Sequence, residues 1–317
     1  MNRQTGNCLL CQTVPFRGGR DMDYAKAGVA VVILLLAAAA AAVEIYRETH
    51  CFRITRYRVP AEKLAGILRD VKILFLSDLH NCTYGNENER LLQSIRDEDP
   101  DLILIGGDML VGKAGAPYET ALHFVEQLPG ICPTVYANGN HELRMKEDTE
   151  TYGDAYGVYR NSLEKRGVHF LEDSRIRVEL GDVSLQICGL ELPSSTYKKF
   201  RKDRITANDI EGHFGFSSSA DSYTILLAHN PAYMEAYLEW GADMVLSGHL
   251  HGGLIRVPGI GGIVTPQGFL FPRYSGEMTR KGSQTVIVSR GLGTHTLNIR
   301  LFNTPELISI QLGGKRL

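Results

Sequence analysis

Five short segments of the chain place aspartate, asparagine or histidine directly after a run of apolar residues. They read Asp78-Leu79-His80, Gly106-Gly107-Asp108, Gly139-Asn140-His141-Glu142, His229-Asn230-Pro231 and Gly248-His249-Leu250-His251. A single such histidine is usually a satisfied polar group, but five segments in one chain indicate shared chemistry. In extended backbone, side chains two positions apart point the same way, so Asp-x-His and His-x-His can chelate one ion or flank two. A donor set of oxygen and imidazole without thiolates favours Mn²⁺, Fe or Zn²⁺ over a structural zinc site.

Strands and helices that alternate along the chain are predicted to position these segments. Continuous apolar runs at Val71–Asp78, Asp101–Asp108 and Thr134–Asn140 are typical of buried strands. Helices are predicted at Asn86–Asp97, near Pro117–Gln127 and at Tyr156–Arg166, and later strands at Arg175–Leu180, Val183–Gly189, Tyr223–Ala228, Met244–Ser247, Thr285–Ser289 and Leu307–Gln311. We therefore expect an α/β domain with mixed sheets, stacked as two layers, and a ligand site beyond the carboxyl ends of the strands.

The order D-x-H, G-D, G-N-H-E, a lone histidine and G-H-x-H resembles the motif series of calcineurin-like metallophosphoesterases, over residues 71 to about 311. HGGLIRVP (His251–Pro258) and SRGLGT (Ser289–Thr294) resemble the bacterial branch that carries an amino-terminal membrane segment. The resemblance implies a four-layer α/β/β/α sandwich with two divalent metal ions, Mn, Fe or Zn, between the sheet edges.

The resemblance also implies a role for each residue of the motif series. One metal would be held by Asp78, His80 and His251, the other by Asn140, His229 and His249, and Asp108 would bridge both. His141 matches the catalytic histidine that contacts the phosphate and assists the leaving group. Glu142 would either orient an imidazole or form a structural salt bridge. Two cations about 3.5–4 Å apart clamp an in-line displacement at phosphorus and activate a water molecule as the nucleophile.

The amino-terminal part of the chain has a different composition. Ala27–Val43 is an apolar run without charge or proline, near the minimum length for crossing a bilayer, and Tyr24 and Tyr46 flank it. We expect a tail (1–26), a single-pass transmembrane anchor (27–46), a polar connector (47–70) and a phosphoesterase domain (71–317). A cleaved signal peptide is the alternative, since small residues follow the run. Basic residues are nearly balanced on its two sides, so either orientation in the membrane is open.

Several cationic residues outside the motif series are candidates for substrate binding. Lys198 and Arg201 belong to a basic stretch, Tyr197–Arg204, which is either a solvated surface or a segment facing lipid or substrate. Arg273 and Arg290 lie in or near Gly-rich segments and either contact phosphate or tie down loops. His295 follows SRGLGT and is a further candidate near the site.

These features together predict a membrane-anchored phosphohydrolase. It would cleave phosphomonoester, phosphodiester or pyrophosphate bonds of a phosphorylated small molecule or lipid, with an envelope substrate favoured by the anchor. The alternatives are a soluble-nucleotide phosphodiesterase and a catalytically silent metal-binding scaffold for a protein partner. With 34 Lys+Arg against 36 Asp+Glu, the formal charge of −2 disfavours a nucleic-acid partner.

Overall fold

The computed structural model describes residues 18–64, 69–216, 222–253, 256–257, 261–265, 267–294 and 299–313. The chain divides into two units, Met1–Glu44 and Ile45–Leu317. Helix α1 (Gly18–His50) begins in the first unit and ends in the second. The most apolar 18-residue window of its segment Lys26–His50 has a mean hydropathy of 2.5, and the segment is long and apolar enough to cross a membrane. Leu34, Leu35 and Leu36, which point in different directions around the helix, are each more than 60% exposed among the described residues.

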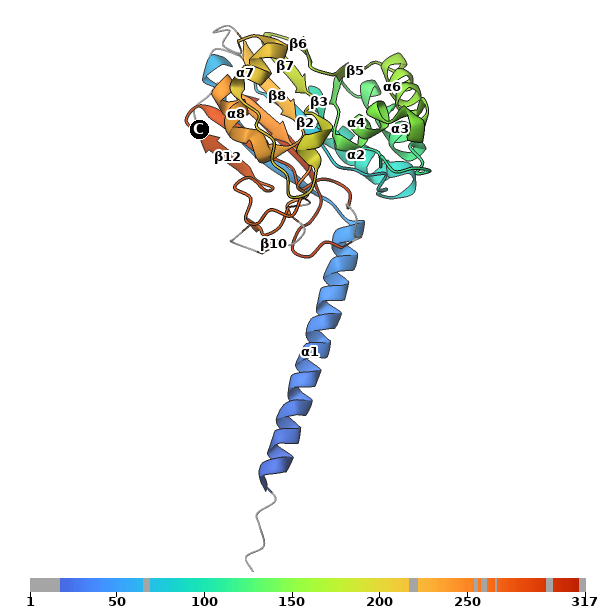
Figure 1. Cartoon of the computed structure of the whole chain (residues 1–317), viewed down its shortest axis with the longest axis vertical. Coiled ribbons are helices and arrows are strands. Elements are labelled where there is room, and N and C mark those ends of the chain that lie inside the picture. Colours follow the sequence, from blue (N-terminus) through green and yellow to red (C-terminus); the bar gives the residue numbers. More distant parts are fainter. Residues whose placement is uncertain are drawn as a thin grey trace, which may run out of the picture. The chain divides into compact units, whose positions relative to one another are not determined.

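Two six-stranded mixed sheets form the second unit (Figure 1). The first has the order β1-β14-β2-β3-β4-β5 and the second the order β12-β13-β9-β8-β7-β6, with a separate two-stranded ribbon, β10-β11. The strands are β1 (Arg53–Pro60), β2 (Val71–Leu76), β3 (Leu102–Ile105), β4 (Thr134–Ala137), β5 (Val168–Leu171), β6 (Ser174–Leu180), β7 (Val183–Leu190), β8 (Tyr223–Ala228), β9 (Met244–Ser247), β10 (Arg256–Val257), β11 (Gly261–Gly262), β12 (Met278–Lys281), β13 (Gln284–Val288) and β14 (Glu306–Gly313).

Helices cover the outer faces of both sheets. The α-helices are α2 (Glu89–Glu98), α3 (Glu119–Val125), α4 (Asn140–Glu147), α5 (Thr149–Tyr152), α6 (Ala155–Lys165), α7 (Ala207–Phe214) and α8 (Met234–Trp240). Short 3₁₀ turns are η1 (Glu62–Leu64), η2 (Asn86–Asn88), η3 (Leu128–Gly130), η4 (Ser194–Tyr197) and η5 (Pro231–Tyr233). In Figure 1, α3, α4 and α6 lie on the side of β5, and α7 and α8 cover the other sheet.

Three hydrophobic clusters correspond to the three interfaces between these layers. Ile73 and Phe75 of β2 face Ile225 and Leu227 of β8 in the cluster between the sheets. Leu74 of the same strand β2 points to the opposite face, where the cluster under α2, α3 and α6 lies, and a third cluster lies under α7 and α8. The central strands are therefore buried on both faces, which is why they read as continuous apolar runs. The expected four-layer α/β/β/α sandwich is confirmed.

Most of the described part of segment 47–70, which was expected to be a polar connector, has regular secondary structure. Residues Arg53–Pro60 form β1, which pairs in parallel with β14 along its full length, from Arg53 opposite Glu306 to Pro60 opposite Gly313. The strand was missed because it is an edge strand whose exposed positions carry arginine, so its apolar signal is weak. The compact unit that contains both sheets accordingly begins at Ile45.

The carboxyl end of α1 is also part of the globular unit. Glu48 is 1% exposed, and its carboxylate accepts hydrogen bonds from the backbone N–H of Asn303 and the hydroxyl of Thr304, each at 2.9 Å. The segment that follows the apolar run is thus bound to the loop before β14.

Candidate metal centre

The five motif segments follow strands that run parallel within each sheet. In the first sheet β2, β3 and β4 are parallel neighbours, and in the second sheet β8 and β9 are. Asp78 and Asp108 follow β2 and β3, Asn140 is the first residue of α4 just after β4, and His229 and His249 follow β8 and β9. Parallel strands end at the same edge of a sheet, and all five segments therefore meet where the two sheets adjoin.

The structure brings the predicted ligand atoms together in three overlapping groups, each with all ligand atoms within 4.8 Å of one another. They are Asp78, His80 and His251; His80, Asp108 and His141; and Asp108, His229 and His249. His251 Nε2 lies 3.4 Å from Asp78 Oδ1, and His229 Nε2 lies 3.2 Å from Asp108 Oδ2. Asp108 and His80 each belong to two groups, and of these two residues Asp108 has the carboxylate, whose two oxygens can bridge two ions. All of these residues are buried.

Two buried atoms in this cluster are placed to bind a cation. The Oδ1 atom of Asn140 has no hydrogen-bond partner among the described residues, and the Nε2 atom of His229 lies 3.2 Å from Asp108 Oδ2. His229 Nδ1 lies 2.6 Å from the carbonyl oxygen of Gly106, so it must donate, and Nε2 of the neutral ring carries a lone pair. That lone pair faces a carboxylate oxygen of Asp108, an arrangement that a cation between them would stabilise.

The electrostatics of the metal-free cluster agree with this interpretation. Burial opposes a charge on His229, but the Asp108 carboxylate outweighs it and raises the pKa of His229 to about 10. Burial raises the pKa of Asp78 to about 6, whereas His229 and its neighbours hold the pKa of Asp108 well below its usual range, against the effect of burial. A proton on His229 thus takes the place of the positive charge that the two carboxylates require.

Five of the ligand residues adopt a left-handed backbone that non-glycine residues rarely use. Their φ angles are positive: Asp78 (54°), His80 (48°), Asp108 (56°), His249 (68°) and His251 (50°). Such conformations cost about 1–3 kcal/mol each and persist at sites where the surrounding structure enforces them. The sharp turns direct the side chains of the loops back toward the cluster.

Motif glycines permit the close approach of these loops. A Cβ atom on Gly107 would lie 2.1 Å from the backbone nitrogen of Gly139, and one on Gly248 would lie 1.9 Å from Ser77 Oγ. The backbone N–H of His249 can therefore donate to Asp78 Oδ1 at 2.9 Å, and that of His141 to Asp108 Oδ1 at 2.8 Å. Each carboxylate is held by the backbone of a different ligand loop.

Glu142 has neither of the two roles expected from the sequence. It is fully buried and accepts hydrogen bonds from the backbone N–H groups of Asp108 (2.8 Å), Met109 (2.9 Å) and Gly139 (3.0 Å), and from the hydroxyl of Tyr136 (2.7 Å). Its carboxylate thus joins the loop after β3 to the start of α4. Burial, with repulsion from Asp108, raises the pKa of Glu142 to about 7.

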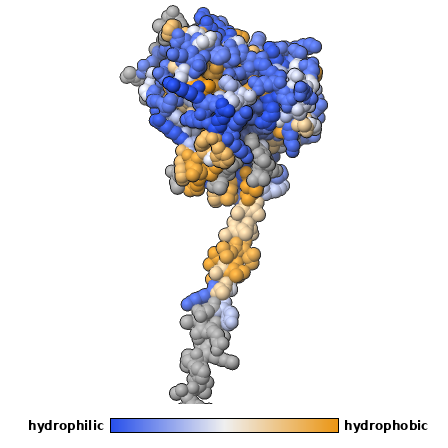
Figure 2. Space-filling model, in the orientation of Figure 1, coloured by the Kyte–Doolittle hydropathy of each residue, from blue (hydrophilic) through white to orange (hydrophobic). Residues whose placement is uncertain are grey.

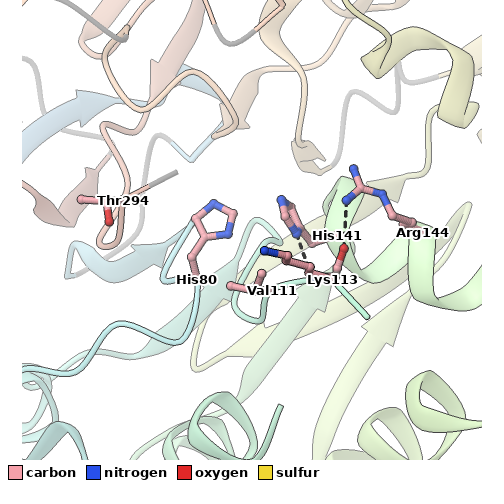
Figure 3. Close-up of a pocket in the computed structure, with 7 residues that line it drawn as sticks. His80, Val111, Lys113, His141, Arg144 and Thr294 are labelled. Atoms are coloured by element: carbon pink, nitrogen blue, oxygen red, sulfur yellow. Dashed lines mark hydrogen bonds between the residues drawn. The ribbon is translucent and has the colours of Figure 1, made fainter. Parts of the chain in front are cut away.

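His141 presents one nitrogen to the cluster and to an adjoining cavity. The backbone N–H of Gly112 donates to its Nδ1 atom at 2.8 Å, so the hydrogen of the neutral ring is on Nε2. Nε2 lies 3.9 Å from Asp108 Oδ2. The cavity beside it has a volume of about 450 Å³ and is lined by His80, Val111, Gly112, Lys113, His141, Arg144 and Thr294 (Figure 3).

The four cations predicted to bind substrate are not among the residues lining the cavities described in this structure. Arg273 is 71% exposed and forms an ion pair with Glu235 at 2.8 Å, and Arg201 forms one with Asp203 at 2.6 Å. Arg290 donates from Nε to the carbonyl oxygen of Gly276, so its guanidinium holds the loop that contains Gly276. Lys198 is exposed next to η4. His295 lies outside the described residues.

Other residues near the cluster were not singled out as site residues by the sequence. The ring of Tyr197 lies 5.1 Å from that of His249, edge to face. Arg300, which is 4% exposed, donates to the carbonyl oxygens of Arg290 and Gly293, and the Asn303 side-chain amide donates to the carbonyl oxygen of His251. No motif marks these residues, because the fold alone brings them to their partners, a histidine ring for Tyr197 and backbone carbonyl oxygens for Arg300 and Asn303.

Comparison with known proteins agrees with the geometry. Residues 71–253 match the model of the calcineurin-like phosphoesterase family. The chain belongs to this family. Relatives include a metallophosphoesterase of Bacillus subtilis, YkuE, which is 27% identical over 83% of this chain and 86% of its own. The phosphodiesterase YaeI of Escherichia coli is 25% identical over 84% of this chain and 90% of its own. A bovine transmembrane protein with a metallophosphoesterase domain is 25% identical over 82% of this chain and 56% of its own.

Proposed function

We propose that this phosphoesterase uses two divalent metal ions, Mn, Fe or Zn, held by the buried cluster, to hydrolyse phosphoester bonds. The supporting observation is that the Asp108 carboxylate, which has two oxygens, belongs to two ligand groups while Asn140 Oδ1 is buried without a hydrogen-bond partner among the described residues. Asp78, His80 and His251 would hold one ion, and Asn140, His229 and His249 the other. The ions would supply an activated water and neutralise phosphate oxygens as charge develops.

Within this proposal the protein's own groups orient the substrate. His141 presents Nε2–H toward the cavity, and it would donate a hydrogen bond to a phosphate oxygen or to the oxygen of the departing group. Its orientation is fixed by Gly112. Glu142 keeps the loops of Asp108 and Asn140 in register, and the left-handed backbone of the ligand residues keeps the site preorganised.

The scaffold alternative is less well supported. A protein that uses the fold only to bind a partner has no need of a complete ligand set held in strained backbone at the edge of a cavity. A phosphodiester is one favoured substrate class, because the E. coli relative is named a phosphodiesterase.

We also propose that α1 is a membrane anchor and that the substrate is a lipid or an envelope component. Support comes from a patch on the globular unit, the aromatic patch, formed by Phe200, Phe269, Leu270 and Phe271. Phe200 is 78% exposed, Leu270 and Phe271 are each 64% exposed, and Phe269 is 37% exposed. The two loops touch, because the N–H of Phe200 donates to the carbonyl oxygen of Gln267 at 3.0 Å. Figure 2 shows apolar side chains gathered at one end of this unit.

The surroundings of the aromatic patch favour a lipid surface as its partner. Lys198, Lys199, Arg201 and Lys202 adjoin Phe200 in the sequence and are exposed. Exposed aromatic rings beside lysine and arginine are the combination that binds the headgroup region of anionic bilayers. The basic stretch noted in the sequence would then face lipid and not substrate.

The hydrolytic proposal is tested with the full chain in detergent micelles. With Mn²⁺ it should hydrolyse p-nitrophenyl phosphoesters, and Asn140→Ala and His249→Ala should each lower turnover at least a hundredfold without unfolding the protein. Lys165→Gln, on the exposed end of α6, is the matched control. If the wild-type protein is inert with every metal and ester type, or both ligand variants retain full turnover, the proposal is wrong.

The lipid proposal needs a different measurement. Replacing Phe200 and Phe271 with serine should reduce the rate on a phospholipid or lipid diphosphate in vesicles at least fivefold, with the rate on a soluble aryl phosphodiester as the internal reference. An equal decrease in rate on both substrates, or no decrease on either, would show that the aromatic patch has no role in binding a lipid surface.

A further inference from the structure

The cavity beside His141 carries two cations that the proposed chemistry does not use. Lys113 and Arg144 line it, and its other described lining residues are neutral or histidine, so none of the described lining residues is acidic. Neither cation has an acidic partner in the described part of the chain. Their neighbour Lys146, by contrast, binds Glu172 at 2.9 Å and Glu191 at 2.6 Å. The cavity thus presents two cationic side chains and, among its described lining residues, no carboxylate.

Both cations are held on a fixed backbone. Gly112, which precedes Lys113, donates its N–H to His141 Nδ1, and its carbonyl oxygen accepts from Arg144 at 2.9 Å and from the Tyr152 hydroxyl at 3.0 Å. A Cβ atom at Gly112 would lie 2.5 Å from the carbonyl oxygen of His141, so the loop is in close contact with the start of α4. In Figure 3 the Lys113 side chain extends beside His141 on the side of His80.

The size of the cavity shows that the reacting phosphate alone does not fill it. At about 450 Å³ it falls in the range of pockets that bind whole small molecules. The oxygens of the reacting phosphate would already be neutralised by the two metal ions and His141. Arg144 has five N–H donors, of which the structure uses one for Gly112, and Lys113 has three. These donors suit an additional anionic group.

Arg144 also lines a second cavity. The second cavity, of about 200 Å³, is lined by Asn140, Leu143, Arg144, Glu147, Asp148, Ser194 and Tyr197. It contains two acidic side chains, so an anion is repelled there and attracted on the Lys113 side. The cavity beside Lys113 is therefore positively charged and the second cavity is negatively charged. This difference would favour one orientation of a bound substrate, with its anionic group toward Lys113.

We propose that the substrate carries a second anionic group, a phosphate or a carboxylate, close to the reacting phosphoester, and that Lys113 and Arg144 bind it. This rests on the hydrolytic function proposed above and names the substrate class for it. A diphosphate-linked or doubly phosphorylated compound fits, and a simple phosphomonoester or dialkyl phosphodiester leaves the two cations unused. Lys113 is thus a determinant of specificity.

The test compares three p-nitrophenyl phosphodiesters whose second ester group is ethyl, 2-carboxyethyl or 2-phosphoethyl. The full chain in detergent with Mn²⁺ should show a kcat/KM at least tenfold higher for one or both anionic esters than for the ethyl ester. Lys113→Gln should reduce this ratio about tenfold, the loss expected for one charge-assisted hydrogen bond. The control Lys165→Gln, an exposed lysine at the end of α6, should leave the ratio unchanged.

The three esters also distinguish the possible sources of the anion. A gain for the 2-phosphoethyl ester alone assigns the site to phosphate, and an equal gain for both assigns it to any anion. If the wild-type ratio is near one, or if Lys113→Gln lowers all three rates equally, the proposal is overturned.

Failure of the hydrolytic proposal remains distinguishable from failure of this one. Should the wild-type protein hydrolyse none of the esters, binding of propane-1,3-diphosphonate and propylphosphonate to the Mn²⁺-loaded chain is measured by calorimetry. Tighter binding of the diphosphonate that Lys113→Gln weakens at least tenfold upholds the anion site without catalysis. Equal affinities, or equal loss in Lys165→Gln, reject it.

Discussion

Glu142→Gln tests whether one buried carboxylate holds the metal-ligand loops together. Oε2 accepts from the N–H groups of Asp108 and Gly139, and Oε1 accepts from the N–H of Met109 and the hydroxyl of Tyr136. The best orientation of a glutamine keeps its oxygen at the Oε2 position. Its NH₂ group can then donate to the Tyr136 oxygen but cannot accept from Met109, which leaves one buried N–H unsatisfied.

The magnitude follows from that single loss. An orphaned buried N–H costs about 1–3 kcal/mol, the loss of charge assistance in the remaining bonds adds to it, and relief of repulsion from Asp108 subtracts. We expect the free energy of unfolding to fall by about 2 kcal/mol at pH 8, above the pKa of about 7 that burial gives Glu142. Turnover should fall at least tenfold because the Asp108 and Asn140 loops lose their common tie.

Urea unfolding of the full chain in detergent, followed by the fluorescence of Trp240, measures this change. Trp240, the last residue of α8, is buried in the cluster between α7, α8 and the second sheet, and it is the single tryptophan of the chain. Tyr136→Phe is the control, since it removes one donor and leaves all three N–H groups satisfied, with an expected loss of about 1 kcal/mol. If Glu142→Gln is as stable as wild type and retains its metal affinity and turnover, the assigned role of Glu142 is refuted.

Three further predictions follow from individual contacts. Glu48→Ala should lower the free energy of unfolding by about 2 kcal/mol, because the Asn303 N–H loses its buried acceptor. The control Glu62→Ala, at an exposed position, should change it by less than about 0.5 kcal/mol. Equal effects of the two variants in urea unfolding would contradict this prediction. Gly248→Ala should abolish metal binding in a calorimetric titration, because its Cβ would lie 2.3 Å from Asp78 Oδ2, whereas Gly130→Ala, with open space around it, should bind normally. Chelation should lower the thermal midpoint by several degrees, since ions at a thousand times their Kd stabilise the folded state by about 4 kcal/mol; an unchanged midpoint would show that no ion binds the cluster tightly.

Much of the fold was predictable because its central strands are buried on both faces. β2 places Ile73 between the sheets and Leu74 under the helices, so each position is apolar and the run is unambiguous. β1 lacked a continuous apolar run, because an edge strand exposes many of its side chains. It is defined by its pairing with β14, which is distant in the sequence. Helix α4 was hidden because its first residues, Asn140 to Glu142, are the motif itself and not an amphipathic pattern.

The cluster of candidate ligands was predictable because metal binding requires particular side-chain types in a particular order. The residues that support it were not, because their partners are backbone atoms. Glu142 binds N–H groups, Arg300 and Asn303 bind carbonyl oxygens, and no residue type in the sequence marks such contacts. In the sequence, Lys113 and Arg144 look like any other surface cations. Their position in the cavity next to His141 is what makes them candidates for substrate binding.

The central claim is that Asp108 joins two metal ions that together hydrolyse a phosphoester. The most direct measurement titrates the metal-free full chain with Mn²⁺ and follows bound metal, by mass spectrometry of the elements, together with the rate on an aryl phosphodiester. We predict that the rate rises to its maximum only as the second equivalent binds, and that Asn140→Ala lowers the affinity for one of the two ions. Full activity with one equivalent bound, or two bound ions without hydrolysis of any phosphoester, would contradict the account.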